Sequence, residues 1–372
     1  MKRFNRIKII LTGTAISFLV LACNISKSDS DTGKHSDKNK KNLYESGNNS
    51  YADDSLVIAF YNVENLFDTI NDPKTDDNDF TPDGANLWTG ERYRKELNQL
   101  SSVICRIGNR LPAVVGLAEV ENKKVVEELI HTGELATGNY AVIHEESPDT
   151  RGIDVAMIYR KDIFQYISHT SIHVILPSDT NSKLRDILHM QLKLDNDTFH
   201  FFVNHWKSRQ PSINETEIKR IETAQILREY IDKLFYINKK SKIIVMGDFN
   251  DEPKSKSLYK TLYATENMLN AKYNELYNLL YQKSLKGEGT ISRDYAWFMF
   301  DNLIVSQSLI DNKGYDVLNK DGFVYKDERI LYYNSKAGFK IPNKTYGGKS
   351  YYGGYSDHLP VYFILKKSPM PE

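Results

Sequence analysis

Hydrophobic residues from position 55 onward form short continuous runs in some segments and evenly spaced stripes in others. Continuous apolar runs at 56–61, 113–118 and 242–246 are typical of buried strands. Between positions 187 and 194 every second residue is apolar, which indicates a strand with one buried face. The same reasoning predicts further strands at 140–144, 154–159, 172–176, 199–204, 302–305 and 359–365.

Two longer segments show helical spacing. In residues 91–107 the apolar side chains of Tyr93, Leu97, Leu100 and Ile104 fall on one helix face, and Gly108 follows as a stop signal. Residues 218–235 form a second long helix, and shorter helices are predicted at 125–130, 257–263 and 275–283. Alternating strands and helices predict an α/β fold. No linker or repeat interrupts residues 55–368, so we expect one domain there.

The first 54 residues follow a different pattern. Four basic residues precede an apolar run of about thirteen residues, too short to cross ~30 Å of hydrocarbon, so residues 1–22 are predicted to be a signal peptide. The junction Ala22-Cys23 resembles a bacterial lipoprotein signal, which would make Cys23 the lipid-bearing first residue. An ordinary secretory signal is the alternative. Residues 23–54 are polar and predict a disordered tether.

Composition narrows the function classes. Lys and Arg total 49 and so do Asp and Glu, so the net charge is zero and a strong, sequence-blind hold on nucleic acid through bulk charge is disfavoured. The chain has two cysteines, Cys23 and Cys105, which exclude a disulfide scaffold and a four-thiolate zinc site. Cys105 continues an apolar helical stripe, which indicates a buried and inert thiol.

Polar residues with catalytic potential follow several predicted strands. Gly247-Asp248-Phe249-Asn250 comes directly after the run 242–246, so both polar side chains would stand at a sheet edge. There Asp248 could hold a metal or activate water, and Asn250 could orient a phosphoryl oxygen. A capped turn is the alternative. Glu119 closes the run 113–118, and a carboxylate in that place suits a hard cation such as Mg²⁺.

Ser356-Asp357-His358 precedes the last predicted strand. Adjacent strand residues face opposite ways, so these three cannot relay a proton among themselves as a serine hydrolase triad does. Asp357 beside His358 fits a metal ligand next to a base.

Two further strand ends are polar. Asn62-Val63-Glu64 follows the first strand, and His205 lies close to Lys207 and Arg209, which suits phosphate handling. A structural histidine and a solvated loop are the alternatives, and Glu64 is either a second metal ligand or a packed acid. Phosphate-loop and HExxH zinc motifs are absent from the sequence, which disfavours nucleotide-triphosphate motors and common zinc proteases.

This ordered set of strand ends resembles the endonuclease/exonuclease/phosphatase superfamily, which contains pancreatic deoxyribonuclease. The resemblance runs from about residue 56 to 365, and the pair GDFN and SDH is its most specific part. It implies a four-layer α-β-β-α sandwich of two packed mixed β-sheets flanked by helices. It also implies hydrolysis of phosphate esters with Mg²⁺, or alternatively Mn²⁺, and residues 62–67 resemble a secreted bacterial branch.

The resemblance also implies roles for the residues that would hold metal and water. Glu119 would be the principal metal ligand, supported by Asp357, and Asn62 would bind the phosphate or complete the metal shell. Asp248 and Asn250 would orient and activate the attacking water.

For the two histidines the resemblance implies acid–base roles. His205 would stabilise the phosphate and assist the leaving group, and Asp154 falls near the acid that pairs with it. His358 would be the base or a phosphate contact, oriented by Asp301. Arg185 would either touch phosphate or be an ordinary surface residue, and Lys207 and Arg209 could grip a second phosphate.

We therefore expect a lipid-anchored monomer in the bacterial cell envelope, outside the cytoplasm, that hydrolyses phosphodiesters, most simply a nuclease, by in-line attack of water. A lipid or inositol phosphate phosphatase or phosphodiesterase is the alternative enzyme, and an inactive tethered binding module is the alternative class. Two features stay open. The Asp-rich segment 68–83 is either a calcium site or a solvated loop, and the tyrosines of 346–355 either stack on substrate rings or pack within a loop.

Overall fold

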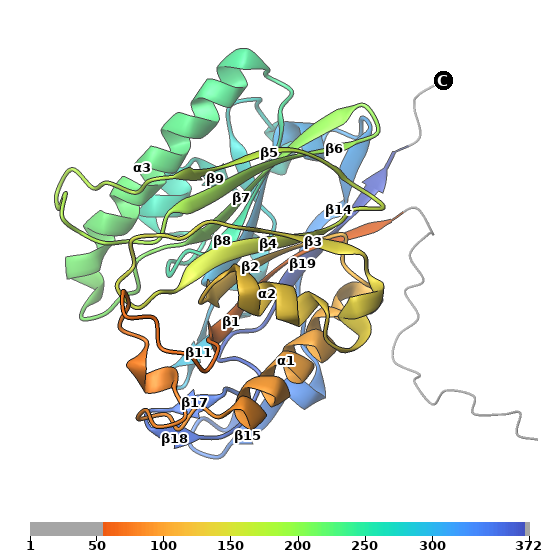
Figure 1. The fold of residues 1–372 in the computed structure, drawn as a ribbon. Coiled ribbons are helices and arrows are strands. Elements are labelled where there is room, and N and C mark those ends of the chain that lie inside the picture. Colours follow the sequence, from red (N-terminus) through yellow and green to blue (C-terminus); the bar gives the residue numbers. More distant parts are fainter. Residues whose placement is uncertain (1–54, 369–372) are drawn as a thin grey trace, which may run out of the picture. The chain divides into compact units, whose positions relative to one another are not determined.

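The computed structural model describes residues 55–368, so the predicted signal peptide, Cys23 and the tether lie outside the described residues. Two mixed β-sheets form the centre of this unit (Figure 1). The first sheet has the order β14 (Tyr315–Val324), β19 (Val361–Lys367), β1 (Leu56–Leu66), β2 (Val114–Val120), β4 (Asp154–Arg160) and β3 (Tyr140–His144). The second has the order β5 (Gln165–Ile172), β6 (Ile187–Leu194), β7 (Asp197–His205), β8 (Lys242–Asp248), β13 (Asp301–Ser306), β10 (Leu276–Asn278) and β9 (Ala264–Thr265).

Helices cover the outer face of each sheet. The helices α1 (Gly90–Ile104) and α2 (Lys123–Ile130) pack on the first sheet, where Leu97 and Leu100 share a buried cluster with Leu117. The long helix α3 (Ile213–Ile237) packs on the second sheet, and Ser212 caps it by accepting a hydrogen bond from the Glu215 N–H. The order helix, sheet, sheet, helix (Figure 1) confirms the predicted four-layer sandwich.

Short elements complete the described unit. Three two-stranded hairpins lie outside the large sheets: β11 (Ile291–Arg293) with β12 (Ala296–Phe298), β15 (Leu331–Asn334) with β16 (Phe339–Pro342), and β17 (Tyr346–Gly347) with β18 (Ser350–Tyr351). Short helical turns occur at α4 (Tyr281–Leu285), Asn78–Phe80, Ile107–Asn109, Gly133–Thr137, Lys256–Thr261, Met268–Asn270, Gln307–Leu309 and Glu328–Ile330. Within residues 55–368, we find no helix that combines the length and the hydropathy needed to cross a membrane.

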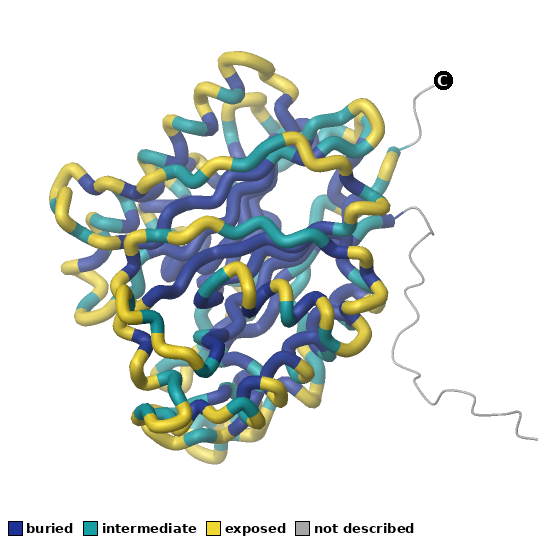
Figure 2. The backbone as a smooth tube through the Cα atoms, in the orientation of Figure 1, coloured by how far each residue is buried: buried dark blue, intermediate teal, exposed yellow. Residues whose placement is uncertain are grey.

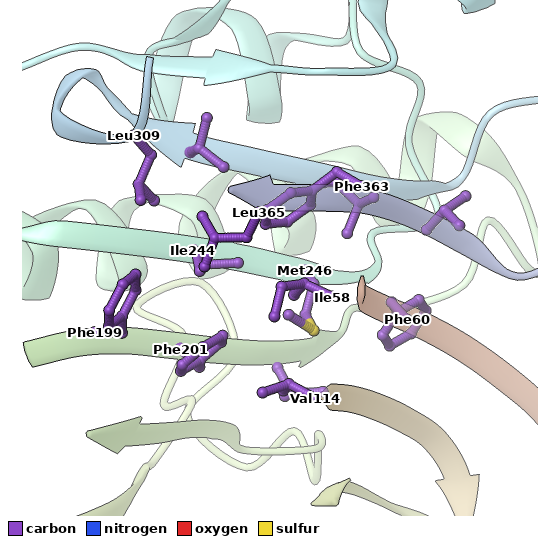
Figure 3. Packing of buried hydrophobic residues seen from close by; sticks show 14 of the residues in the cluster. Ile58, Phe60, Val114, Phe199, Phe201, Ile244, Met246, Leu309, Phe363 and Leu365 are labelled. Atoms are coloured by element: carbon purple, nitrogen blue, oxygen red, sulfur yellow. The ribbon is translucent and has the colours of Figure 1, made fainter. Parts of the chain in front are cut away.

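The main hydrophobic core lies between the two sheets. Phe60 and Val114 from the first sheet meet Phe201, Ile244 and Met246 from the second, and all five are fully buried (Figure 3). Figure 2 shows the central strands buried along most of their length and the exposed residues in the loops and along the helices. Apolar burial on this scale is the dominant force that holds two sheets face to face.

Strand register places the polar strand ends at one rim. In the second sheet β7 runs parallel to β8 and pairs His205 with Asp248, while antiparallel β13 pairs Asp301 with the same Asp248. In the first sheet β1 runs parallel to β2, and Asn62 pairs with Ala118, next to Glu119. Non-local pairing therefore assembles side chains from five strands.

Some sequence predictions are corrected by the structure. The strand predicted at 172–176 is β5 at Gln165–Ile172, an edge strand with mostly exposed side chains and so no apolar run. The helix predicted at 275–283 is strand β10 followed by α4, because Leu276–Asn278 pairs with β13. The patterns used here did not predict β14 or the hairpins at 291–351. Cys105 is buried and free as predicted, and burial is the main cause that raises the pKa of its thiol to about 11.

Candidate active site

Asn62 lies at the centre of the rim and joins the two sheets. Its fully buried amide nitrogen donates to Glu119 Oε1 of the first sheet and to Asp248 Oδ2 of the second, at 3.2 Å each. Its amide oxygen accepts the N–H of Glu64 at 3.0 Å. Asn62 therefore positions two carboxylates, and its role as a metal ligand stays a prediction.

Glu119 leaves its strand through an irregularity. Its φ is +64°, and the pairing of β2 with β4 shifts register between Ala118 and Val120, which turns the side chain toward the rim. A non-glycine residue in this region costs about 1–3 kcal/mol, and such strain is concentrated at functional sites. Glu119 Oε2 also accepts the N–H of Asn65 at 3.1 Å.

The carboxylates at this rim fit a divalent cation. Burial and the negative charge of Asp357 raise the pKa of Glu119, and the same two causes raise the pKa of Glu64 well above its ordinary value. Acids that repel one another in a buried setting are stabilised by a cation. The donors are oxygens, as Mg²⁺ and Mn²⁺ prefer. Glu119 and Asp357, both on the cleft wall, are the residues that would hold it.

His358 and Asp301 form a buried pair, as the resemblance implied. His358 Nδ1 lies 2.7 Å from Asp301 Oδ2, and its Nε2 lies 3.7 Å from Asp248 Oδ2. Burial alone would lower the pKa of His358, but the charges of Asp301, Asp248 and Asp357 raise it well above its ordinary value. These three carboxylates therefore favour the protonated form of His358, which lines the cleft.

His205 has the opposite electrostatic setting. Its Nε2 lies 3.6 Å from both Glu119 Oε1 and Asp248 Oδ2, while its buried Nδ1 has no hydrogen-bond partner among residues 55–368. Burial and then the charges of Arg185 and Arg151 lower the pKa of His205 well below its ordinary value. The ring is therefore neutral.

The predicted pairing of Asp154 with His205 is wrong. Asp154 Oδ2 lies 3.2 Å from His144 Nε2, and its Oδ1 accepts the N–H of Ser147 at 2.9 Å. Asp154 thus holds the base of the 145–153 loop, next to the cleft. Its strand, β4, is reached through β2 in the first sheet, whereas His205 belongs to the second.

Asp248 and Asn250 form a tight turn at the end of β8. The N–H of Asn250 donates to Asp248 Oδ1 at 2.8 Å, and Asn250 has a φ of +50°. The segment is therefore a capped turn, and this is compatible with a functional role for Asp248 and Asn250. Asn250 donates its amide to Trp206 O at 3.2 Å, and its buried side-chain oxygen has no partner within residues 55–368. Burial is the main cause that raises the pKa of Asp248.

These residues line a cleft of about 430 Å³. Five cationic side chains take part in its wall: Arg151, Lys183, Arg185, Lys207 and Arg293. The ammonium of Lys207 has no ion pair or hydrogen bond in the described part of the chain. Burial and then the charges of Arg185 and Arg151 lower the pKa of Lys207. Crowded positive charge beside carboxylates suits an anionic ligand held next to a cation.

The structure gives different roles to Arg185 and Arg209, the two arginines considered as substrate contacts. Arg185 is buried, pairs with Asp149 at 2.6 Å and donates to the carbonyl oxygens of His205 and Trp206, so it shapes the wall and is no surface residue. Arg209 donates to Asn250 O at 2.8 Å and pairs with Asp251 at 3.1 Å. Arg209 does not line the cleft, so its assignment as a substrate contact is corrected to a support of the Asn250 turn.

Contacts in the structure bear on the open alternatives. Glu64 accepts the N–H groups of Thr345 and Tyr346, as a packed acid does. In the 68–83 segment Asp68, Asp72 and Asp77 accept backbone N–H groups, and the Asp68 side chain also pairs with Lys124. Tyr346, Tyr351 and Tyr355 pack against the hydrophobic cluster beneath α1. Arg151 and Arg293 were not predicted because each comes from a loop or hairpin without a local motif.

Comparisons with known proteins show the family and the fold. A model of the Endonuclease/Exonuclease/phosphatase family matches residues 57–367. Among solved structures, humanized D. rerio TDP2 has a TM-score of 0.53 at 15% identity, covering 84% of this chain and 99% of its own. Another D. rerio TDP2 structure holds a single strand DNA product.

Two further structures have the same fold. The human Nocturnin catalytic domain, with bound sulfate, gives a TM-score of 0.52 at 14% identity, covering 84% of this chain and 95% of its own. The Bacteroides thetaiotaomicron mannosyl-6-phosphatase Bt3783 gives 0.50 at 18% identity, covering 83% and 99%. At these identities the likeness shows the fold alone. A search of curated proteins found no match.

Proposed function

The chain belongs to the Endonuclease/Exonuclease/phosphatase family, whose members are divalent-metal-dependent hydrolases of phosphate esters, and from this premise we propose that it hydrolyses phosphodiester bonds as a nuclease. The observation that carries the proposal is the convergence at one cleft of the Asn62–Glu119–Asp248 cluster and the His358–Asp301 pair. An inactive binding module would not need this buried and mutually repelling set.

The residues of the cleft can take the following roles in the reaction. Lys207 and the cation on His358 bind the anionic phosphate, which lowers its repulsion of a nucleophile. Asp248 Oδ2 lies within 3.7 Å of both histidine Nε2 atoms and can take the proton of the attacking water. A divalent cation bound at Glu119 and Asp357 would polarise a phosphoryl oxygen and make water more acidic.

We propose Mg²⁺ as the metal, with Mn²⁺ as the alternative, because Glu119 and Asp357 offer oxygen donors. Among residues 55–368, the histidine nitrogens near these two carboxylates belong to His205 and His358. A panel of phosphate esters assayed in Mg²⁺, Mn²⁺ and EDTA tests this. We expect turnover with either metal and none in EDTA. Full turnover in EDTA after exhaustive dialysis would reject the metal mechanism.

A second candidate is a phosphatase or phosphodiesterase acting on lipid, inositol or sugar phosphates. It is supported by the mannosyl-6-phosphatase among the proteins of the same fold. The same panel separates the two: single-stranded and duplex DNA, RNA, a phospholipid, an inositol phosphate and a sugar phosphate. We expect the highest kcat/KM on nucleic acid. A preference for the lipid, inositol or sugar esters would favour the second candidate.

We further propose that the mature protein is a monomer anchored to a bacterial envelope membrane, outside the cytoplasm, through lipid on Cys23. The junction Ala22-Cys23 and the polar segment that follows support this. Mass spectrometry of membrane-extracted protein should find lipid on residue 23, and Cys23→Ser should release or misprocess the chain. An unmodified Cys23 in the membrane fraction would refute the anchor.

A further inference from the structure

A second pocket adjoins the candidate active-site cleft. This pocket has a volume of about 410 Å³ and lies between the hairpins β11–β12 and β15–β16. Arg293 and Asp357 line both spaces, so the two are adjacent. The β11–β12 hairpin also contacts the segment that contains His358. Ile291 forms a β-bridge with His358, and the N–H of Leu359 donates to Thr290 O at 2.8 Å. A group bound in the second pocket is therefore placed relative to His358.

The lining of the second pocket combines aromatic rings, two cations without ion pairs and two acids, Asp294 and Asp357. Tyr295 and Tyr332 line it with 57% and 37% of their surfaces exposed. Lys344 lines it too, and its ammonium has no ion pair or hydrogen bond with any residue of 55–368. Arg293, at the junction with the cleft, contacts the face of Phe300 and is not ion-paired within the same residues.

Tyr295 is held in a costly backbone conformation. Asp294 and Tyr295 form the two-residue turn of the hairpin and have φ values of +48° and +60°. Such turns favour Asn-Gly, and a bulky residue in the left-handed region is an outlier. The strain is not repaid by packing, because the tyrosine ring is mostly exposed. Strain held beside a ligand cleft supports a functional interpretation.

We propose that the second pocket is a subsite for the nucleotide next to the scissile phosphate of a single strand. The base stacks on Tyr295 and Tyr332, and the neighbouring phosphate binds Arg293 and Lys344. Stacking on aromatic side chains beside a basic groove is how single strands are held without sequence preference. A neutral sugar ring could use the tyrosines but would leave the cations without an anion. The inference rests on the proposed phosphodiesterase function and narrows its substrate.

The kinetic test compares a substrate that reaches the second pocket with one that does not. The two substrates are oligothymidylate dT8 and bis(4-nitrophenyl) phosphate, each in Mg²⁺. Tyr295→Gly should lower the ratio of their kcat/KM values roughly tenfold, the scale of one lost stacking contact. The unfolding midpoint should not fall, because glycine relieves the strained turn. The matched control is Tyr333→Ala, an exposed tyrosine beside Tyr332 that does not line the pocket, and its ratio should not change.

A binding test in EDTA is independent of turnover. Fluorescence anisotropy of labelled dT8 gives the dissociation constant as a function of salt. Lys344→Gln should reduce the slope of log K against log salt by about 0.7, the value for one phosphate contact on a single strand. Lys336 is an exposed lysine in the turn of the β15–β16 hairpin and does not line the pocket, so Lys336→Gln should leave the slope unchanged.

The outcomes separate this inference from the proposed function. If wild-type protein hydrolyses neither ester in Mg²⁺ or Mn²⁺, the phosphodiesterase function fails, and the binding test still judges the subsite. If the small ester is hydrolysed but Tyr295→Gly and Lys344→Gln match their controls, the subsite is overturned. A third outcome is that mannose 6-phosphate competes with dT8 for the wild-type protein but not for Tyr295→Gly, while dT8 itself binds both equally well. This result would assign the pocket to sugars and would also overturn the nucleotide subsite.

Discussion

Single buried residues impose the geometry of the cleft at a cost in stability. Asn62 holds Glu119 and Asp248 from different sheets at 3.2 Å each, and burial raises the pKa of both acids. Clustered buried acids of this kind weaken the folded state unless a cation neutralises them. Function, more than stability, explains their presence in this chain.

Glu119→Gln should therefore separate stability from metal use. Removing a buried charge should leave the unfolding midpoint unchanged or raise it, while the Mg²⁺ concentration needed for half-maximal activity should rise roughly tenfold or more. Chemical denaturation and a Mg²⁺ titration of activity measure the two effects. Asp149→Asn is a useful contrast, because it leaves the buried Arg185 unpaired and should lower the midpoint. An unchanged Mg²⁺ requirement in Glu119→Gln would remove this residue from the metal site.

Asp301→Asn should change the pH dependence of turnover. The carboxylate 2.7 Å from His358 Nδ1 raises the pKa of the ring, so an amide in its place should lower that pKa. If the cationic ring binds phosphate, activity is lost as pH rises through this pKa, and the alkaline limb should move to lower pH. Turnover at neutral pH should also fall roughly 100-fold. A pH profile of kcat/KM checks both, and an unmoved alkaline limb would contradict the cationic role.

At the scale of elements, the contact of β7 with β8 places two of the catalytic candidates. Register pairs His205 with Asp248 across these parallel strands, and Gly247 makes the close approach possible. A Cβ on Gly247 would lie 2.3 Å from Asn204 O, a backbone atom that cannot move without its strand. Steric crowding against β7 therefore explains why the first residue of the GDFN motif is a glycine.

Gly247→Ala should separate these two strands. We expect a loss of about 1–3 kcal/mol in the free energy of unfolding, typical of overpacking, together with a large loss of turnover because His205 and Asp248 both shift. Urea denaturation and kcat measure the two effects. The control is Gly287→Ala, where a Cβ meets nothing within 4 Å but φ is +81°, so only backbone strain is added. Equal turnover in the two variants would contradict this explanation.

Two neighbouring histidines of the second sheet, buried His189 and half-buried His200, should make stability depend on pH. Burial lowers the pKa of His189 to about 3 and that of His200 to about 4, and Tyr230 of α3 lies 3.2 Å from the His189 ring. Between pH 6.5 and 4 these two histidines bind more protons in the unfolded chain than in the folded one. Their contribution should therefore lower stability as the pH falls, by at most about 1.4 kcal/mol per pH unit for each histidine.

Urea midpoints measured from pH 7 to pH 4 check this dependence. His189→Phe removes one titrating group and should flatten the curve, whereas His131→Gln, at an exposed helix end, should leave it unchanged. Identical curves for wild type and His189→Phe would show that this pair does not control acid stability.

At the scale of the whole molecule, both large sheets and every residue of the cleft belong to 55–368. A chain that begins at residue 55 should therefore keep the kcat/KM of the full-length protein on a soluble ester and lose only its place in the cell. Parallel assays of the two forms, with and without membranes, check this. A truncated protein that folds but is inactive would assign residues 1–54 a part in catalysis.

The sequence by itself determined which chemistry reaches the rim. Short apolar runs that end in Asn62, Glu119, His205 and Asp248 predict buried strands with polar ends, because local hydrophobic pattern sets strand position and the residue that follows it. The ordered motifs were sufficient to predict the sandwich through the family resemblance. Nothing non-local is needed for these inferences.

Only the tertiary structure decided which groups face one another. Asp301 meets His358 while Asp154 meets His144, because register and sheet order, and not spacing along the chain, set these distances. The same holds for Arg293 and for the hairpins of the second pocket, which are short, partly exposed and without periodicity. Their positions depend on contacts with residues distant in the sequence, and a local pattern contains no information about such contacts.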